Sequence, residues 1–246
     1  MIPKVINYCW FGGNPLTEKA EMCIKSWKTF LPDYEIRRWD ESNFDIEICQ
    51  YVKEAYAAKK WAFVADYFRI WVLYNYGGIY FDSDVEVTKS FDEFLDYELF
   101  TGYETDITLE PAVVGCISGH TLFKELLGYF TSKSFYSNGN EDLTPLPYKF
   151  TEPFTKNYGL TLNNQRVLLD NNQMAIYPTD WFSPMDYETG ELKKTDNTHA
   201  IHRYAASWVG GGTNFRAKIY SVLSKLFGKK FAYKMRKKFG RQKKEI

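Results

Sequence analysis

The chain has 246 residues, of which 45% are hydrophobic and 25% are charged, and its formal net charge at pH 7 is zero. These values are ordinary for a soluble globular protein with room for one large domain or two small ones. The four cysteines stand far apart without a CxxC spacing, which argues against a zinc ribbon or a dense disulfide framework and fits a reducing compartment.

Neither a membrane span nor an export signal is expected from the sequence. No run of about 18 uncharged apolar residues occurs, so we expect no membrane-spanning helix. The first residues, MIPKVINYCW, lack a basic segment followed by a long apolar one, so we expect no signal peptide. The aromatic content of 18% is high. It fits either a tyrosine-rich core or walls for planar and sugar ligands.

The first part of the chain predicts a strand, a helix and a second strand. Residues 4–10 are rich in β-forming side chains and end at a Gly-Gly turn. Residues 17–30 have helical spacing up to Pro32, and residues 34–39 predict the second strand. Because this order is the start of a βαβ unit, an α/β fold is favoured.

Two further helices and a strand pair are expected next. Residues 45–58 predict one helix, and residues 61–76 predict another that ends at Gly77-Gly78, where glycine permits a positive φ. Two short strands, IYF and VEV, then flank an Asp-Ser-Asp turn. The later elements are strands near 97–103 and 111–117, a helix at 120–130, a loop at 132–147, a helix at 148–158, and strands at 174–178 and 199–204.

The end of the chain differs in charge from the rest. Twelve of the 31 Lys and Arg residues lie in 216–246, where Glu245 is the single acidic residue. Apolar residues recur there at helical spacing with lysines between them, which predicts a basic amphipathic helix. We therefore divide the chain into a body, residues 1–213, and a basic helical tail, residues 214–246. The tail suggests a negatively charged surface as partner; a solvated basic tail is the alternative.

Asp82 and Asp84 are the first candidates for chemistry. They directly follow a strand of Ile, Tyr and Phe, and two carboxylates two residues apart can converge on one cation as the chain turns. Carboxylate oxygens suit Mg²⁺ or Mn²⁺, which share their ligation with substrate phosphates. The alternative is a solvated acidic turn. The strongly apolar strand in front of the pair favours the metal site.

The helix at 61–76 carries two charges on an otherwise apolar surface. Asp66 and Arg69 are three residues apart, hence on one face. A helix this apolar is expected to be buried, and buried charges need partners. An internal salt bridge is one interpretation. The interpretation we favour is a pair that faces a polar ligand, with Arg69 binding phosphate or sugar oxygens and Asp66 accepting from sugar hydroxyls.

The three histidines are expected to have different roles. His120 is expected to start a helix in a structural role. His199 and His202 face opposite sides of a strand, so a two-histidine site is not expected. His202 can still complete a metal shell begun by the aspartates, although a structural role is the alternative.

Several long segments resemble a known family. The chain resembles the DXD-containing glycosyltransferases of capsular and other polysaccharide synthesis, glycosyltransferase family 32, whose superfamily includes a yeast initiating α-mannosyltransferase and the clostridial toxin glucosyltransferases. The resemblance implies a GT-A fold with a Rossmann-like mixed sheet, a nucleotide-sugar donor, Mn²⁺ or Mg²⁺, and retention of anomeric configuration. The matching segments are IPKVINYCWFGG (2–13), SWKTFLPDYEIRRWDESNFD (26–45), AFVADYFRIWVLYNYGGIYFDSDVEV (62–87) and AIHRYAASW (200–208).

The resemblance also implies roles for single residues. Trp10 is expected to stack on the nucleobase. Asp66 and Arg69 are expected to contact the donor sugar. Asp82 is expected to contact ribose, sugar or a water on the metal, and Asp84 to bind the metal that bridges the diphosphate.

Two late segments complete this implied site. His202 resembles a late metal ligand of related GT-A enzymes. Ser207 and Trp208 resemble the loop that closes on the diphosphate. Because the toxin branch uses Glu and Ser there, His202 and Ser207 compete for the third metal position.

We therefore predict a metal-dependent retaining hexosyltransferase acting in surface polysaccharide synthesis. UDP-hexoses are the expected donors, GDP-mannose is an alternative, and a saccharide or lipid-linked saccharide is the acceptor. No carboxylate stands out as a nucleophile for double displacement, so front-face substitution is preferred. We expect a cytoplasmic enzyme, held at the inner face of the membrane by 214–246.

Two other function classes fit parts of the sequence. A non-catalytic carbohydrate-binding protein would use the aromatic residues and would need neither metal nor nucleotide. A nucleic-acid binder would use the basic tail and show a steep salt dependence. Neither explains Asp66, Arg69 and the two aspartates at 82 and 84 together, so no nucleic-acid partner is expected.

Overall fold

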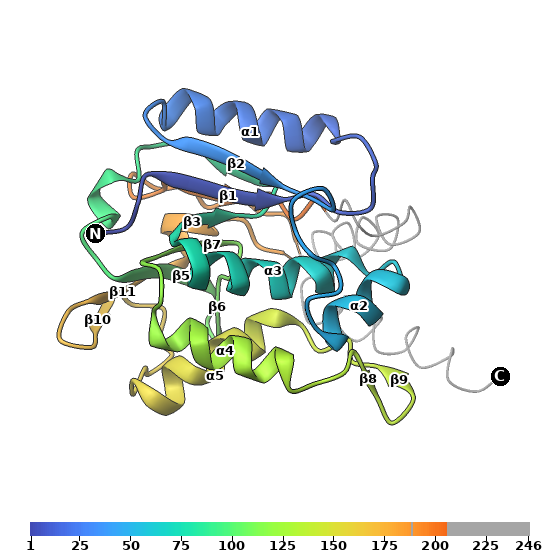
Figure 1. Cartoon of the computed structure of the whole chain (residues 1–246). Coiled ribbons are helices and arrows are strands. Elements are labelled where there is room, and N and C mark those ends of the chain that lie inside the picture. Colours follow the sequence, from blue (N-terminus) through green and yellow to red (C-terminus); the bar gives the residue numbers. More distant parts are fainter. Residues whose placement is uncertain (188, 206–246) are drawn as a thin grey trace.

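A computed structural model describes residues 1–187 and 189–205. Its centre is a mixed sheet with the strand order β10-β11-β5-β7-β3-β1-β2, to which β6 adds beside β5 (Figure 1). Strand β1 is parallel to both β2 and β3, whereas β7 is antiparallel to its neighbours β3 and β5. The predicted βαβ start is therefore confirmed, and the fold is α/β with a mixed sheet.

The strands and helices have the following bounds. The strands of the main sheet are β1 (Val5–Cys9), β2 (Glu35–Trp39), β3 (Gly78–Phe81), β5 (Leu99–Thr105), β6 (Thr108–Leu109), β7 (Val113–Cys116), β10 (Val167–Leu169) and β11 (Met174–Tyr177). Two smaller sheets pair β4 (Val85–Val87) with β12 (Ala200–His202), and β8 (Tyr136–Ser137) with β9 (Asn140–Glu141). The helices are α1 (Glu18–Phe30), α2 (Gln50–Ala57), α3 (Trp61–Tyr76), α4 (Thr121–Thr131), α5 (Leu146–Asn157) and α6 (Thr179–Phe182), with a 3₁₀ turn at Asp92–Phe94.

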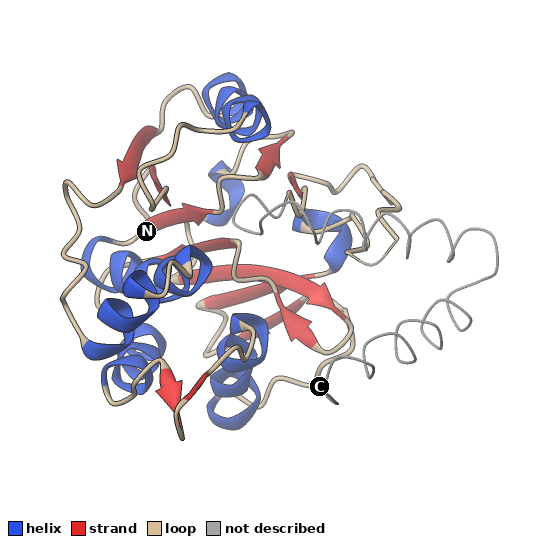
Figure 2. Ribbon diagram, turned by 90° about the vertical axis from the view of Figure 1, so that its right-hand side faces the viewer, coloured by secondary structure: helices blue, strands red, loops and turns tan. Residues whose placement is uncertain are grey.

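Helices cover both faces of the sheet. Helix α1 lies on one face, and α2, α3, α4 and α5 lie on the other (Figures 1 and 2). Each layer has its own aromatic core: Trp27 of α1 packs on Phe81, and Phe68 of α3 packs on Trp39 and Tyr80. Burial of these large side chains is the main stabilising term. Aromatic side chains therefore build both cores, which bears out one of the two explanations of the high aromatic content.

Helix α3 is joined to β3 by two glycines in the left-handed region. Gly77 has φ +67° and Gly78 has φ +91°. The N–H of Gly77 donates to the carbonyl of Leu73, which ends the helix. A Cβ on Gly78 would lie 2.6 Å from the carbonyl oxygen of Val5 in β1. These glycines let the buried helix return directly into the sheet and so place the end of β3 beside α3.

Most predicted elements are found, with three corrections. The helix predicted from residue 45 begins only at Gln50, because Asp45 accepts from the N–H of Glu47 in a turn. The predicted loop at 132–147 contains the β8–β9 hairpin, whose turn residues Asn138 and Gly139 both have positive φ. Strands β6 and β10 and helix α6 were not predicted; their short segments carry little periodicity.

Two further predictions concern the basic tail and membrane-spanning helices. The predicted basic helix and the boundary at 213/214 lie outside the described residues. No described helix is long and apolar enough to cross a bilayer.

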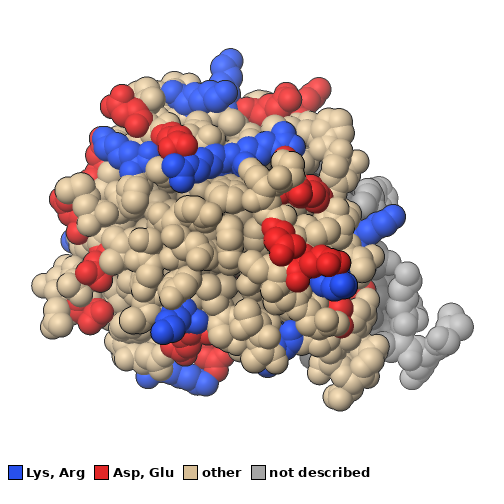
Figure 3. Space-filling view, viewed as in Figure 1, with Lys and Arg blue, Asp and Glu red and all other residues tan. Residues whose placement is uncertain are grey.

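On the face drawn in Figure 3, basic side chains form a band over the upper part, where β2 and α1 lie, and smaller clusters of both signs lie below it. The acidic excess of the body is therefore not gathered on this face.

Candidate active site

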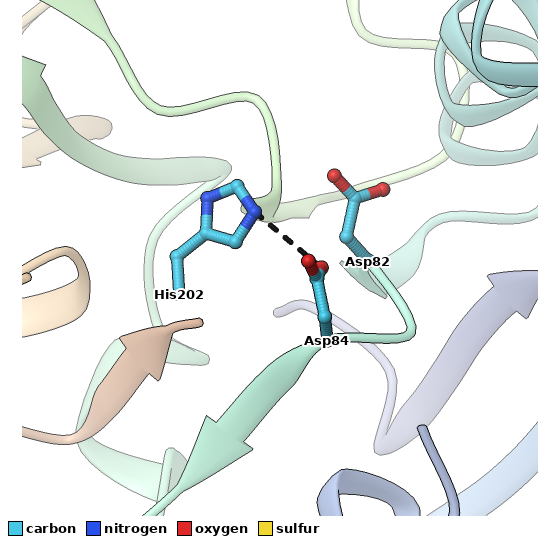
Figure 4. Close-up of side chains that lie close together, drawn as sticks. All are labelled: Asp82, Asp84 and His202. Atoms are coloured by element: carbon cyan, nitrogen blue, oxygen red, sulfur yellow. Dashed lines mark ion pairs between the residues drawn. The ribbon is translucent and has the colours of Figure 1, made fainter. Parts of the chain in front are cut away.

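Three chain segments bring Asp82, Asp84 and His202 together. Asp82 directly follows β3 and Asp84 directly precedes β4. Strand β12 pairs with β4 so that His202 lies opposite Val85, next to Asp84. The three side chains point toward one another, and the His202 ring faces the Asp84 carboxylate (Figure 4). The prediction that His202 joins the two aspartates is therefore confirmed in its geometry.

The three side chains fit a divalent cation. One ligand atom of each lies within 4.8 Å of the others, and His202 Nε2 is 3.4 Å from Asp84 Oδ1. Two carboxylates and an imidazole suit a hard or intermediate ion such as Mg²⁺ or Mn²⁺. All three are only partly exposed, so an ion here would keep some ligand positions open for water or phosphate.

A buried glutamate fixes the orientation of His202. The Nδ1 of His202 lies 3.1 Å from Oε2 of Glu110, and Glu110 is completely buried. Glu110 also accepts from the N–H of Ala112 at 2.9 Å and from the hydroxyl of Ser183. With Nδ1 engaged there, Nε2 is the nitrogen that faces Asp84. Carboxylates behind ligand histidines commonly set both ring orientation and basicity in metal sites.

The same contacts hold charge in the site. Burial alone would lower the pKa of His202, but the carboxylates of Glu110 and Asp84 outweigh it and leave the pKa well above 6.5. Burial would raise the pKa of Asp84, but His202 and the N–H of Ala205, which donates to Asp84 Oδ2 at 2.7 Å, leave it lowered. Asp84 is therefore an ionised carboxylate.

Arg69 joins α3 to the aspartates. Its Nη2 lies 3.1 Å from Asp66 Oδ1, and its Nη1 lies 3.1 Å from Asp82 Oδ2 and 3.0 Å from the carbonyl oxygen of Pro111. Asp66 and Arg69 share one helix face, as predicted, and form the ion pair of the first interpretation; that the pair also faces a ligand stays a prediction. The additional contact to Asp82 makes the two predicted halves of the site one connected group of charges.

The two aspartates of the turn have different surroundings. Asp82 accepts from Arg69 at Oδ2 and from the Tyr80 hydroxyl at Oδ1, at 2.7 Å. Asp84 directs Oδ1 toward His202, and its Oδ2 accepts from the N–H of Ala205. The expectation that Asp84 is the direct ligand and Asp82 acts partly through water stays a prediction.

Asp66 is ionised at a cost. Burial raises its pKa to about 6, although Arg69 acts in the opposite direction. Its side chain is 14% exposed, so a small part of it can be reached from outside. A carboxylate kept partly unsatisfied in such a place can accept hydrogen bonds from a ligand.

Trp10 lies at the same end of the sheet. It follows β1, and the parallel register of β1 with β3 places it level with the Asp82–Asp84 turn. Its Nε1 donates to the carbonyl of Asn14 at 2.8 Å, which closes the glycine loop. Trp61 packs over this loop, since a Cβ on Gly12 would lie 2.7 Å from the Trp61 ring. Two tryptophans therefore flank the glycine loop that follows β1.

The remaining predicted residues separate as follows. His120 caps α4 by accepting from the N–H of Leu122, and His199 stacks on Trp181 with Nδ1 2.7 Å from the Ser90 carbonyl oxygen. The structural interpretation of His120 is confirmed, and His199 likewise has structural contacts. Ser207 and Trp208 lie outside the described residues, so the competition between Ser207 and His202 stays open.

Sequence reasoning missed Glu110 and its neighbour Glu104. Burial and the charge of Glu110 raise the pKa of Glu104 to about 7. The one available signal was an acidic residue, Glu110, set between two apolar strands in TLEPAVV. The contact with His202 spans 92 positions of the sequence and leaves no local pattern.

Comparisons with known proteins agree with this geometry. Residues 17–101 match the family model described as "Glycosyltransferase sugar-binding region containing DXD motif", a range that includes α3, Asp82 and Asp84. Inositol phosphoceramide mannosyltransferase 3 of Schizosaccharomyces pombe is 31% identical over 134 residues, which are 51% of this chain. The aligned part spans 36% of that protein, so this chain spans well under half of its relative.

A solved structure supports the fold. PaToxG glycosyltransferase superposes with a TM-score of 0.52 at 21% identity, covering 63% of this chain and 68% of that one. At this identity the likeness concerns the fold alone. It confirms the expectation of a GT-A fold with a mixed central sheet.

Proposed function

We propose that this member of the DXD-containing glycosyltransferases transfers a hexose from a nucleotide-sugar to a hydroxyl group of a saccharide acceptor, with retention of configuration. One observation carries the proposal: Arg69 connects Asp66 on α3 with the Asp82, Asp84 and His202 cluster. A nucleotide-sugar has a sugar and a diphosphate side by side. The site has a hydroxyl-accepting carboxylate and a cation-binding cluster side by side.

Each residue has a defined part in this proposal. Asp82, Asp84 and His202 would hold Mn²⁺ or Mg²⁺, which when bound neutralises charge on a leaving diphosphate. Arg69 adds positive charge on the same side, and Asp66 accepts from sugar hydroxyls. Trp10 offers a ring to the base. Ser207 and Trp208, by their resemblance, close over the diphosphate.

The proposed chemical step is front-face substitution. The bond between the anomeric carbon and the phosphate oxygen breaks, and the acceptor oxygen bonds to the same face of that carbon. The proton of the acceptor hydroxyl passes to the departing phosphate oxygen. This route needs no carboxylate nucleophile beside the anomeric carbon, and Asp66 is already engaged by Arg69.

The donor is proposed to be a UDP-hexose. GDP-mannose is a second candidate, favoured by the name of the fission-yeast relative, a mannosyltransferase. We propose a surface polysaccharide as the product because of the family resemblance.

A donor screen tests the proposal. Full-length protein is incubated with Mn²⁺ and, separately, UDP-glucose, UDP-galactose, their N-acetyl forms and GDP-mannose, and release of the nucleoside diphosphate is measured. We expect hydrolysis of one donor well above the others. Absence of release from every donor, with the protein folded and Mn²⁺ present, would contradict the proposal.

We further propose that residues 214–246 attach the cytoplasmic enzyme to the anionic inner face of the membrane. The support is the basic and apolar periodicity of that segment. Co-sedimentation with phosphatidylserine vesicles should be lost when Lys229, Lys230, Lys237 and Lys238 are replaced by Gln. Equal sedimentation of both proteins would contradict the attachment.

A further inference from the structure

An exposed tyrosine is joined to the candidate metal site by two ring contacts. Tyr187 lies in the connection between α6 and β12 and is 67% exposed. Its ring packs against the ring of Tyr204, with 5.2 Å between the ring centres and an angle of 71° between the planes. Tyr204 in turn lies against His202, with 4.0 Å between the ring centres. A single aromatic ring therefore separates this open tyrosine from a proposed metal ligand.

The segment that carries the exposed tyrosine is tied to the support of His202. Near its start, the hydroxyl of Ser183 donates to Glu110, the buried carboxylate that also contacts Nδ1 of His202. Further along, the N–H of Asp186 donates to the carbonyl of Glu191 at 2.8 Å, which closes a turn around the tyrosine. The segment is therefore held beside the site by hydrogen bonds of its own and by a group that the site uses.

Tyr204 has a backbone conformation that is rare for a bulky side chain. Its φ is +45°, in the left-handed region. The next residue, Ala205, donates its N–H to Oδ2 of Asp84 at 2.7 Å. Strained residues of this kind persist where the surrounding contacts hold them, and they gather at functional sites. The backbone that follows His202 is thus held against Asp84 while the ring of Tyr204 stays on His202.

The two tyrosines lie on the side of the cluster away from the proposed donor-sugar residues. Asp66 and Arg69 reach the cluster through Asp82, which Arg69 contacts at 3.1 Å. The tyrosines reach it through His202, and Figure 4 shows His202 and Asp82 to either side of Asp84. In the proposed front-face substitution the acceptor oxygen approaches on the same face as the departing diphosphate. The acceptor is therefore expected beside the cluster, where the tyrosines lie.

We propose that Tyr187, backed by Tyr204, is the platform on which a sugar ring of the acceptor stacks. The assignment rests on the proposed function, because it places the acceptor relative to the proposed donor and cation. Tyrosine offers a large, rigid face with few torsions to immobilise, and such a face suits the apolar side of a sugar ring. The platform sets how tightly the acceptor binds.

A nucleobase is the other planar ligand that an exposed tyrosine can stack on. The position proposed for the base is Trp10, which follows β1 of the main sheet, whereas Tyr204 follows β12, which pairs with β4 in a separate sheet. The sugar ring is therefore the favoured ligand of the tyrosines. The two ligands differ in which substrate's KM they affect.

The kinetics of acceptor use test the platform. Full-length protein, Mn²⁺ and the best nucleotide-sugar are incubated with methyl α- and β-glycosides of glucose, galactose, mannose and N-acetylglucosamine, and release of the nucleoside diphosphate is measured. The KM values for the glycoside and for the donor are determined for the unaltered protein, Tyr187→Ala and Tyr187→Trp. The matched control is Tyr148→Ala, which replaces a 55% exposed tyrosine of α5. Thermal unfolding confirms that each variant is folded.

We expect at least one glycoside to accelerate release of the nucleoside diphosphate. Tyr187→Ala should raise the KM for that glycoside about tenfold or more, equivalent to about 1.4 kcal/mol, without a matching rise in the KM for the donor. Tyr187→Trp keeps an aromatic face and should restore the KM for the glycoside. Tyr148→Ala should resemble the unaltered protein in both KM values.

Three results would overturn the platform: acceleration by no glycoside, an unchanged KM for the glycoside in Tyr187→Ala, or a rise confined to the KM for the donor, as a stacked nucleobase would give. Donor hydrolysis without any glycoside reports separately on the proposed function. Hydrolysis that no glycoside accelerates removes only the platform, whereas absence of release from every donor removes the enzyme and the platform with it.

Discussion

Arg69 is the residue on which both halves of the candidate site depend. It is 6% exposed and contacts two carboxylates and two carbonyl oxygens, so its guanidinium group has little freedom. A planar, always charged group suits this position better than lysine would. That Asp66 and Arg69 lie on the same helix face could be predicted from their three-residue spacing. The contact from Arg69 to Asp82 could not, because it depends on how α3 packs against β3.

Asp66 is expected to be needed for donor hydrolysis and to lower the free energy of unfolding. Its pKa of about 6 exceeds the ordinary value near 3.8, so the folded protein disfavours the ionised form. The cost is absent below about pH 4, where the group is protonated in both states, and is fully present above about pH 6. We predict that Asp66→Asn raises the free energy of unfolding at pH 7 by about 1 kcal/mol and removes donor hydrolysis.

Urea unfolding at pH 7 and at pH 4 checks this prediction. The gain in stability should shrink at the lower pH. Asp33→Asn, at an exposed position, serves as control and should change neither stability nor hydrolysis. A clear loss of stability in Asp66→Asn at pH 7 would show that Asp66 is a structural ion-pair partner instead.

Glu110 is predicted to position His202. Replacing it by Gln keeps the shape but removes the charge behind Nδ1, 3.1 Å away. Loss of such a supporting carboxylate typically costs about 10- to 100-fold in metal affinity or activity. We expect this range for donor hydrolysis, together with a higher Mn²⁺ requirement.

The control for Glu110→Gln is Glu35→Gln, an exposed glutamate that pairs with Arg37 on β2. Titration of donor hydrolysis against Mn²⁺ distinguishes a Glu110 that positions His202 from one that only stabilises the fold. If Glu110→Gln unfolds at the same temperature and keeps the full rate at the same Mn²⁺ concentration, the positioning role is wrong.

At the scale of elements, the α3–β3 connection decides where the site is built. Its sequence, an apolar helix followed by Gly-Gly and a short strand, predicted this arrangement because glycine at a helix end is a local signal. The β8–β9 hairpin also has a local signal, Asn138-Gly139, but its strands are two residues long and their polar residues hide the pattern.

Gly78→Ala should destabilise the protein through this connection. The new Cβ would approach the Val5 carbonyl oxygen to 2.6 Å at a φ of +91°. We expect a loss of about 2 kcal/mol or more, since both backbone strain and a close contact to β1 arise. Gly128→Ala, inside α4 with open space around the Cβ, should gain about 0.5–1 kcal/mol. Equal effects of the two substitutions on thermal unfolding would contradict the role of the connection.

At the scale of the whole molecule, the α/β class and most elements could be predicted from the sequence, but their order in the sheet could not. Strand β7 inserts between β3 and β5 with antiparallel register, and β12 returns to pair with β4 from more than a hundred residues away. Such pairings depend on shape and packing over the whole sheet and leave no periodicity. For this reason Asp82, Asp84 and Arg69 were found from local patterns, whereas Glu110 was missed.

Donor hydrolysis under control of the metal tests the central claim most directly. The hydrolysis rate of the best nucleotide-sugar is measured in Mn²⁺, in excess EDTA and after Mn²⁺ is restored, for the unaltered protein and for Asp84→Asn. We predict that EDTA removes the activity, that Mn²⁺ restores it, and that Asp84→Asn lowers the rate at least about 100-fold while keeping its fold. Full activity in excess EDTA, or in folded Asp84→Asn, would contradict a metal-dependent transferase at this site.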